Sequence, residues 1–308
     1  MLLNLALNPC IFDPTQYSNN SLCDPLLGNL KNVLLEEALV RDLRNGDWMK
    51  YIGDNSSIWH SRAKELIKKI IRQNRTYKAE SVGAQNPNSY SEWCKEAILS
   101  HETKNLNGII AATGTVTSFS SSPVVTCIEK LHNAAWWTAR SNSVRLQKKI
   151  TDYLKHLDLL LKHANSFMFI DPFFDPSEAN YQDFQQLLQV IARREIKPKV
   201  EFHRKESLVV AGVRKVLTPK EWENRFLPFK PILASNGMAA EVFIWDDFHD
   251  RYIISDIAGI LVPHGLDVSN RASAETTWSR ISRSDRDDVQ KEFHPAAGRH
   301  ILKGSFFI

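Results

Sequence analysis

The sequence predicts an α/β protein in which helices cover both faces of a mostly parallel sheet. Apolar runs too short for helices alternate along the chain with longer segments whose apolar residues recur every three or four positions. Strands and helices that alternate at this spacing favour parallel pairing through helical crossovers. Of 308 residues, 43% are hydrophobic and 24% are charged, which is the composition of a packed globular protein.

A smaller α/β unit is expected over residues 1–122. Its first residues form a short apolar run without basic residues, which ends at Pro9 and is typical of a strand rather than of a signal peptide. The expected strands of this unit are 2–7 and 107–112. The expected helices are 29–44, 57–73 and 89–100, and the polar stretch 76–92 is expected to be a surface loop.

A larger unit is expected over residues 123–308. Ser122 and Pro123 suit an N-cap and a first helical position, so they predict a helix that begins there. Thr218 and Glu221 predict a capping box at the start of another helix. Further helices are expected near 144–161 and 178–194, and buried strands at 166–174, 199–205 and 240–247.

The charge and cysteine patterns exclude few partners. A formal net charge of +4 tolerates a polyanionic ligand without demanding one. The four cysteines are scattered and form no C-x-x-C pair, which is typical of reduced thiols in a cytoplasmic protein rather than of a disulfide framework. No apolar run approaches the roughly 18 residues of a transmembrane helix.

The strongest functional signal is the order H-x-R-x4-D at His249, Arg251 and Asp256, followed by Gly-Leu-Asp ending at Asp267. Two residues that are two positions apart on a strand project from the same face. An imidazole and a guanidinium placed in this way could meet one phosphate together. The imidazole would then act as nucleophile or acid and the guanidinium as a charge clamp.

This segment resembles the phospholipase D-like superfamily, whose motif is H-x-K-x4-D followed by Gly-Ser and Asn. It is most similar to the single-motif branch at the C-terminus of MIT-domain proteins, which has H-D-R, a hairpin and Gly-Leu-Asp. The resemblance covers about residues 140–308, and its specific part is the segment 248–267. Arg251 replaces the superfamily's Lys, and Pro263-His264 stand in place of Gly-Ser. The resemblance therefore supports phosphate binding better than phosphoryl transfer.

The resemblance implies a role for each motif residue. In the superfamily, one histidine attacks phosphorus and a second protonates the leaving oxygen, while lysines neutralise the phosphoryl oxygens without a metal or other cofactor. On this chain, His249 would be the nucleophile or acid, Arg251 the phosphate clamp and Asp256 an orienting group. Because there is one motif per chain, a two-histidine site requires a homodimer.

The segment His203-Arg204-Lys205 is nominally a second H-x-K. No Asp follows it at the motif spacing, so we interpret it as a strand that ends in basic residues. Lys205 is retained as a candidate phosphate contact.

The Gly-Leu-Asp segment is expected to lie opposite the motif in a β-hairpin. If the hairpin turns at 257–258, Arg251 faces His264, and both share one face of the sheet with His249. This patch would be catalytic or phosphate-binding, with Asp267 orienting a histidine. The alternative is a histidine cluster with structural partners at the end of a strand, which Asp267 simply terminates.

Two features of the first half are weaker candidates. A basic stripe of four residues at helical spacing could contact a nucleic-acid backbone, although a solvated helix face is the commoner explanation of such a stripe. The stripe comprises Lys64, Lys68, Arg72 and Arg75. Asp13 follows the first strand, as in some metal-dependent nucleases, but no converging carboxylates are evident, so no metal site is predicted.

The leading hypothesis is phosphodiester recognition on nucleic acid by a homodimer, extended to metal-independent hydrolysis if the chemistry survives the Lys-to-Arg change. By the resemblance, stand-alone bacterial proteins of this kind often serve as nucleases in defence, and a protein partner in a multi-component system is then expected. The alternative is a non-catalytic module that binds phosphoinositide head groups or a protein partner. The chain shows no amphipathic anchor or polybasic tail, which weighs against membrane binding.

Overall fold

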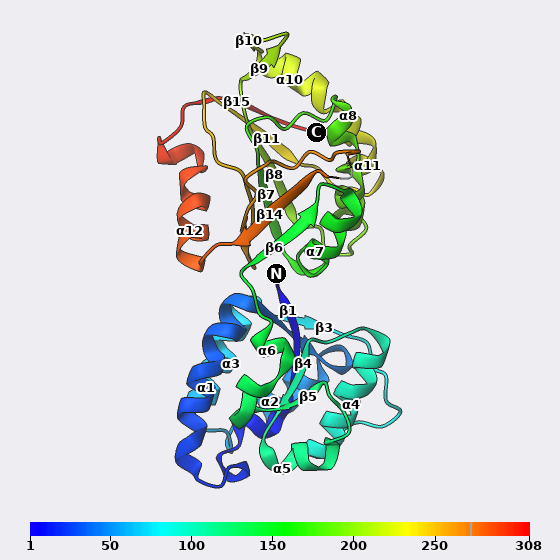
Figure 1. Ribbon diagram of the computed structural model, residues 1–308, viewed down its shortest axis with the longest axis vertical. Helices are drawn as coiled ribbons and strands as arrows, with labels where there is room; N and C mark the ends of the chain where they lie inside the picture. Colours follow the sequence, from blue (N-terminus) through cyan, green and yellow to red (C-terminus); the bar gives the residue numbers. More distant parts are fainter. Residues whose placement is uncertain (272) are drawn as a thin grey trace. The chain divides into compact units, whose positions relative to one another are not determined.

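The computed structural model describes residues 1–271 and 273–308, and the chain divides into two compact units (Figure 1). They are the N-terminal unit, Leu2–Arg140, and the C-terminal unit, Ser141–Ile308. Each unit combines helices with a β-sheet, which confirms the mixed α/β class predicted from the sequence. A search of the described residues finds no helix with the length and apolarity of a membrane span.

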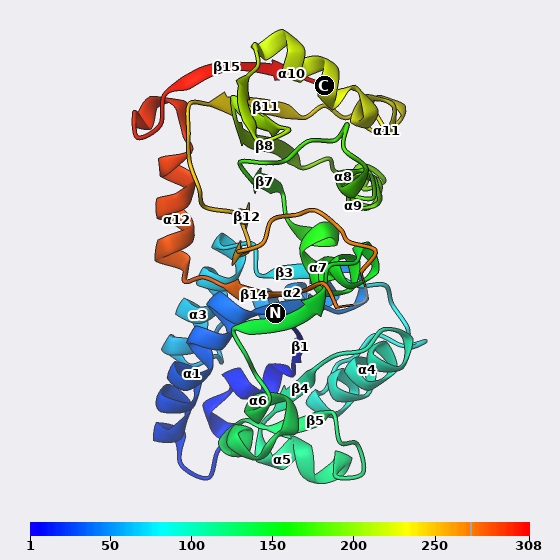
Figure 2. The same cartoon turned by 45° about the horizontal axis from the view of Figure 1, so that its top comes forward.

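The N-terminal unit is built on a parallel sheet, in which the described strands follow the order β3-β2-β1-β4-β5. The strands are β1 (Leu3–Leu7), β2 (Ala38–Asp42), β3 (Thr76–Lys78), β4 (Gly108–Ala111) and β5 (Val125–Cys127). Helices α1 and α3 lie on one side of this sheet and α4 on the other (Figures 1 and 2). The α-helices are α1 (Cys23–Asn32), α2 (Asp47–Asp54), α3 (Ser61–Arg72), α4 (Tyr90–Thr103), α5 (Thr113–Val116) and α6 (Ala135–Thr138).

The predicted helix 29–44 is wrong in its second half. A π-helical turn at Val33–Glu37 ends α1, and the chain then continues as β2. The leucines, glutamates and alanine of this segment favour a helix locally. Tertiary context overrides that preference, because every residue of β2 is buried between its two neighbouring strands.

The predicted helix that begins at Pro123 is also wrong, and with it the predicted boundary at residue 122. The β-branched residues near Val125 extend the sheet beside β4 as strand β5, and a 3-10 helix, Ile128–Asn133, follows. Residues 123–140 therefore belong to the N-terminal unit.

The C-terminal unit is built on a mixed sheet, in which the described strands follow the order β15-β11-β8-β7-β12-β13-β14-β6. Strands β7, β8 and β11 are parallel, and the remaining neighbours pair antiparallel. The strands are β6 (Ser143–Gln147), β7 (Ser166–Ile170), β8 (Lys199–Lys205), β11 (Glu241–Trp245), β12 (Tyr252–Ser255), β13 (Gly259–Leu261), β14 (Glu275–Arg280) and β15 (Leu302–Phe307). A separate hairpin joins β9 (Ser207–Val210) to β10 (Val213–Val216).

Helix α12 covers one face of this sheet, and the other helices of the unit lie on the opposite side (Figures 1 and 2). The α-helices of the unit are α7 (Ile150–His163), α8 (Ala179–Gln182), α9 (Gln185–Ala192), α10 (Pro219–Phe226), α11 (Lys230–Ser235) and α12 (Arg283–Glu292). The capping box of Thr218 and Glu221 is confirmed at the start of α10. The helix predicted near 144–161 instead begins at Ile150, because the residues before it form β6.

Strand β7 contributes buried side chains to the core on both faces of the sheet. Phe167 and Phe169 face the helices, where the Phe169 ring packs on Phe184, while Met168 and Ile170 join the α12 layer. This alternation is the two-residue period of a strand buried on both faces. Each fully buried side chain of this size contributes about 1.5–3 kcal/mol to the free energy of unfolding.

His203 is buried in the aromatic part of the α12 layer. Its Nδ1 accepts a hydrogen bond of 3.1 Å from the Trp245 indole, and its ring stacks on Phe243. Burial lowers the pKa of His203 despite the nearby Glu201 carboxylate. His203 is therefore a structural residue of the core, in agreement with the interpretation of its segment as a strand.

We expect acid to weaken the C-terminal unit through His203. A depressed pKa means that the unfolded chain binds the proton more readily, so stability is lost as pH falls below the unfolded value of about 6.5, by up to about 1.4 kcal/mol per pH unit. Urea unfolding at pH 7.5 and 5.5 checks this expectation. His203→Gln keeps an acceptor but does not titrate, so it should lose less stability on acidification than the wild type; an equal loss would contradict the prediction.

Candidate functional site

A pocket of about 540 Å³ lies at the edge of the C-terminal sheet where the parallel strands end. Carboxyl ends of parallel strands are the usual position of ligand sites in α/β folds, and this volume suits a small ligand or part of a larger one. We call it the edge pocket. Its lining residues are Phe173, Asp175, Glu178, Asn180, Tyr181, Arg204, Leu208, Val209, Arg225, Arg251, His264, Gly265 and Asp267.

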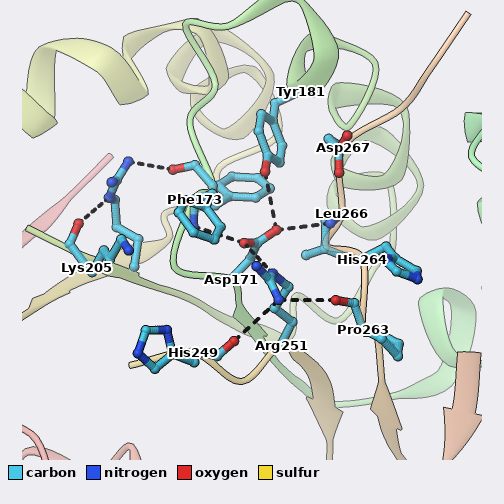
Figure 3. A network of polar contacts seen from close by, with 12 residues as sticks. Asp171, Phe173, Tyr181, Lys205, His249, Arg251, Pro263, His264, Leu266 and Asp267 are labelled. Carbon is cyan, nitrogen blue, oxygen red and sulfur yellow. Dashed lines mark hydrogen bonds and ion pairs between the residues drawn. The ribbon is translucent and has the colours of Figure 1, made fainter. Parts of the chain in front are cut away.

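The fully buried carboxylate of Asp171 lies directly behind the edge pocket, at the end of β7. It accepts backbone hydrogen bonds of 3.0 Å from Phe173 and from Leu266, and its Oδ1 lies 3.6 Å from Nε of Arg251 (Figure 3). Burial raises the pKa of Asp171, while these hydrogen bonds and the guanidinium oppose the rise. Asp171 thus connects three segments that are distant in the sequence.

Arg251 is held in place by backbone acceptors. Its Nη1 donates to the carbonyl of Pro263 at 3.1 Å and to that of His249 at 3.4 Å (Figure 3). Its guanidinium carbon lies 5.0 Å from the centre of the Phe173 ring, and Nζ of Lys205 lies 4.3 Å from the same centre. Phe173 is 43% exposed, so the site presents an exposed aromatic residue with two cations over its ring.

His249 lies outside the edge pocket. Its side chain is 84% exposed, its Nε2 lies 3.9 Å from a carboxylate oxygen of Asp247, and in Figure 3 the ring points away from Arg251. His264 does line the edge pocket beside Arg251. The patch predicted from the sequence is therefore only partly assembled, since Arg251 and His264 share the pocket and His249 does not.

The hairpin has a different register from the predicted one. Its turn lies at Asp256-Ile257, and Tyr252 pairs with Leu261, so Arg251 lies opposite Val262 rather than His264. A slip of two residues leaves each side chain on its predicted face, because side chains alternate with period two.

Asp256 lies at the opposite end of β12 from Arg251. Its Oδ1 accepts a hydrogen bond of 2.8 Å from the backbone N–H of Asn165, where α7 turns into β7. An orienting role for Asp256 at the phosphate site does not fit this position, and the carboxylate stabilises the turn instead.

Asp267 is held by the residues around it. Nζ of Lys148 donates to its Oδ1 at 2.6 Å and to the carbonyl of His264 at 2.9 Å, while the Tyr153 hydroxyl donates to its backbone carbonyl. Asp267 thus pairs with a lysine rather than with a histidine.

Sequence reasoning missed Asp171, Phe173 and Arg225 as parts of this site. Arg225 lines the edge pocket and forms ion pairs with Asp175 at 2.6 Å and with Glu178 at 2.8 Å, which line it too. The Asp-Pro that ends the apolar run at 166–174 was the available signal for Asp171, because polar residues at strand ends gather at one edge of a parallel sheet.

The features of the first half also differ from the expectation. Arg75 is only 2% exposed, so it lies apart from Lys64, Lys68 and Arg72 on α3. The Asp13 carboxylate accepts hydrogen bonds from Tyr90 and Thr15. In the described part of the chain, no three His, Cys, Asp or Glu residues are grouped as metal ligands.

Comparison with known proteins does not assign this chain to a family. No protein-family model and no curated protein matches it. Among solved structures, it aligns with TrmBL2, described as an archaeal chromatin protein with a novel mode of DNA binding, at a TM-score of 0.31 and 9% identity over 80% of this chain and 86% of that one. A TM-score of this size does not establish a shared fold, and no function is drawn from it.

We predict that Gly265→Ala destabilises the site more than Gly237→Ala does. Both glycines have positive φ, of +76° and +63°, which costs an alanine about 1–2 kcal/mol. A Cβ on Gly265 would also lie 2.9 Å from Oδ2 of Asp171, whereas one on Gly237 meets nothing within 4 Å. Chemical unfolding should show a further loss of about 2 kcal/mol for Gly265→Ala, because a buried carboxylate loses a donor. Equal losses in the two variants would mean that the contact with Asp171 adds nothing.

Proposed function

We propose that the C-terminal unit binds single-stranded nucleic acid at the edge pocket, with a base stacked on Phe173 and a phosphate held by Arg251 and Lys205. The observation that carries this proposal is the exposed Phe173, which has two cations within 5.0 Å of the centre of its ring. Bases stack on aromatic side chains while basic groups contact the backbone in proteins that bind single strands without sequence preference.

The charges around the pocket favour an anion next to Phe173. Arg225 and Lys148 already pair with carboxylates, and buried Arg204 donates to backbone carbonyls. Lys205 and Arg251 have longer contacts with carboxylates, at 3.9 Å from Asp247 and 3.6 Å from Asp171, so they are the cations most available to a ligand. Lys205 lies beside Phe173 without lining the edge pocket itself. Burial lowers the pKa of Lys205; the Asp247 carboxylate opposes this shift, and nearby arginines, Arg251 among them, add to it. A bound phosphate would therefore relieve repulsion between Lys205 and Arg251.

The resemblance to the single-motif phospholipase D-like branch supports binding rather than hydrolysis. Arg251 replaces the superfamily's Lys, and a planar guanidinium suits a two-point contact with a phosphate. His249, which would supply the chemistry, lies outside the pocket. A phosphoinositide head group would use the same cations but has no base to stack on Phe173, so nucleic acid is the preferred ligand.

Substitutions at the edge pocket should weaken the binding of a fluorescein-labelled oligothymidylate, measured by anisotropy at low salt. Arg251→Ala removes a charge-assisted contact of about 1.5–3 kcal/mol, so it should raise Kd by about tenfold or more. Phe173→Ala removes about 1–3 kcal/mol of stacking, so it should raise Kd by about fivefold or more. Lys303→Ala removes an exposed cation of β15 outside the pocket and is the matched control.

Two outcomes would contradict this proposal. If Arg251→Ala and Phe173→Ala bind the oligonucleotide as the control does, the edge pocket is not the nucleic-acid site. If Phe173→Ala is silent while an inositol polyphosphate competes as strongly as the oligonucleotide, the pocket recognises a phosphorylated head group instead.

His249→Ala should bind the oligonucleotide with an unchanged Kd, because the imidazole lies outside the edge pocket. A two-histidine enzyme would behave differently. It would be a homodimer by light scattering, would cleave the oligonucleotide in excess EDTA, and would lose that cleavage in His249→Ala while still binding. Cleavage with this pattern would overturn the binding-only assignment, whereas a monomer without cleavage would support it.

A further inference from the structure

A second pocket, of about 560 Å³, lies in the N-terminal unit between α2 and α3. Its floor is apolar and includes Ile52, Trp59 and Ile67. The Trp59 indole N–H already donates to the carbonyl of Ile52 at 2.7 Å, so it is not offered to a ligand. We call this pocket the α2–α3 groove.

A large apolar side chain is also exposed at this groove. Ile71 lines it, next to the apolar floor, and is 53% exposed. Single exposed apolar residues are normal, but apolar side chains grouped around a concave apolar floor mark an interaction site. Covering this groove would remove them from water.

The charged residues that line the groove are Lys64 and Lys68, one helical turn apart on α3. Neither forms an ion pair with a carboxylate in the part of the chain that the structure describes, residues 1–271 and 273–308. The neighbouring Lys69 pairs with Glu65 on the same helix. Helix α3 therefore offers these two cations at the groove.

We propose that the α2–α3 groove binds an acidic amphipathic helix of a protein partner. Apolar side chains of that helix would fill the groove, and carboxylates one turn apart would pair with Lys64 and Lys68, which have the same spacing. A nucleic-acid backbone fits less well, because it would place its charged phosphates over an apolar floor without covering Ile71.

The chain offers a clean way to fill the groove. Gly53 lines it on α2, and a Cβ added there meets nothing within 4 Å, so Gly53→Leu places an apolar side chain in open space. Gly28 on α1 has the same freedom and does not line the groove, so Gly28→Leu is the matched control. For charge, the double variant Lys64→Glu/Lys68→Glu is compared with Lys95→Glu, an exposed lysine of α4.

The probes are two synthetic labelled helices that share a leucine stripe, one flanked by glutamates and the other by lysines at the same positions. Anisotropy with the full-length protein should show the glutamate helix binding at least about tenfold more tightly. Gly53→Leu should weaken this binding about tenfold, and Gly28→Leu should not. The double charge variant should instead prefer the lysine helix, a reversal that misfolding cannot produce, while Lys95→Glu keeps the wild-type preference.

Three results would overturn the proposal. The first is an equal affinity of the two helices for the wild type. The second is binding of an oligothymidylate that the double charge variant abolishes and Gly53→Leu leaves intact, which would make α3 a nucleic-acid surface. The third is self-association of the wild type that Gly53→Leu alone disrupts, which would make a second copy of the chain the occupant.

Discussion

The buried carboxylate of Asp171 is the interaction on which the edge pocket depends. Its oxygens accept hydrogen bonds from the backbone on both sides of the pocket and lie beside the guanidinium of Arg251. A buried charge is tolerated only when it is paired and hydrogen-bonded, so each of these contacts is needed for the others to persist. Gly265 has no side chain, which lets the loop approach this carboxylate closely. Because the hydrogen-bonding capacity of Asp171 is used by the protein, Asp171 positions the site, and under the proposed function Arg251 and Phe173 would contact the ligand.

Sheet topology decides which parts of the sequence motif can act together. Arg251 precedes β12 and lies at the edge where β7, β8 and β11 end, because β12 runs antiparallel to β7. Asp256 follows the same strand, and five steps of about 3.3 Å separate the two residues by roughly 16 Å. A motif that spans a whole strand therefore divides between two edges of the sheet. Its arginine belongs to the pocket, and its aspartate belongs to a turn.

The sequence predicted best what local chemistry decides. The strand 199–205, the capping box at Thr218 and the mixed α/β class follow from patterns within a few residues. The prediction failed at β2, where helix-favouring residues are buried as a central strand, and at the hairpin register. The role of Asp171 also could not be predicted, because it arises from through-space contacts with residues about 80 and 95 positions away. Local propensity contains no information about such partners.

The arrangement of charges distinguishes a binding site from a catalytic one. The metal-free mechanism that the resemblance implies needs an imidazole within hydrogen-bonding reach of the phosphate, in a pocket that excludes water. Here the imidazole of His249 is exposed to solvent. The guanidinium of Arg251, which a phosphate could contact, is held by the backbone carbonyl of Pro263, a group that takes no part in phosphoryl transfer. Rigid, partly buried contacts favour affinity, because little conformational freedom remains to be lost when the ligand binds. Under the proposed function, an arginine at position 251 and the outward position of His249 fit together, since a site that only held a phosphate would gain from a two-point contact and would not need a nucleophile.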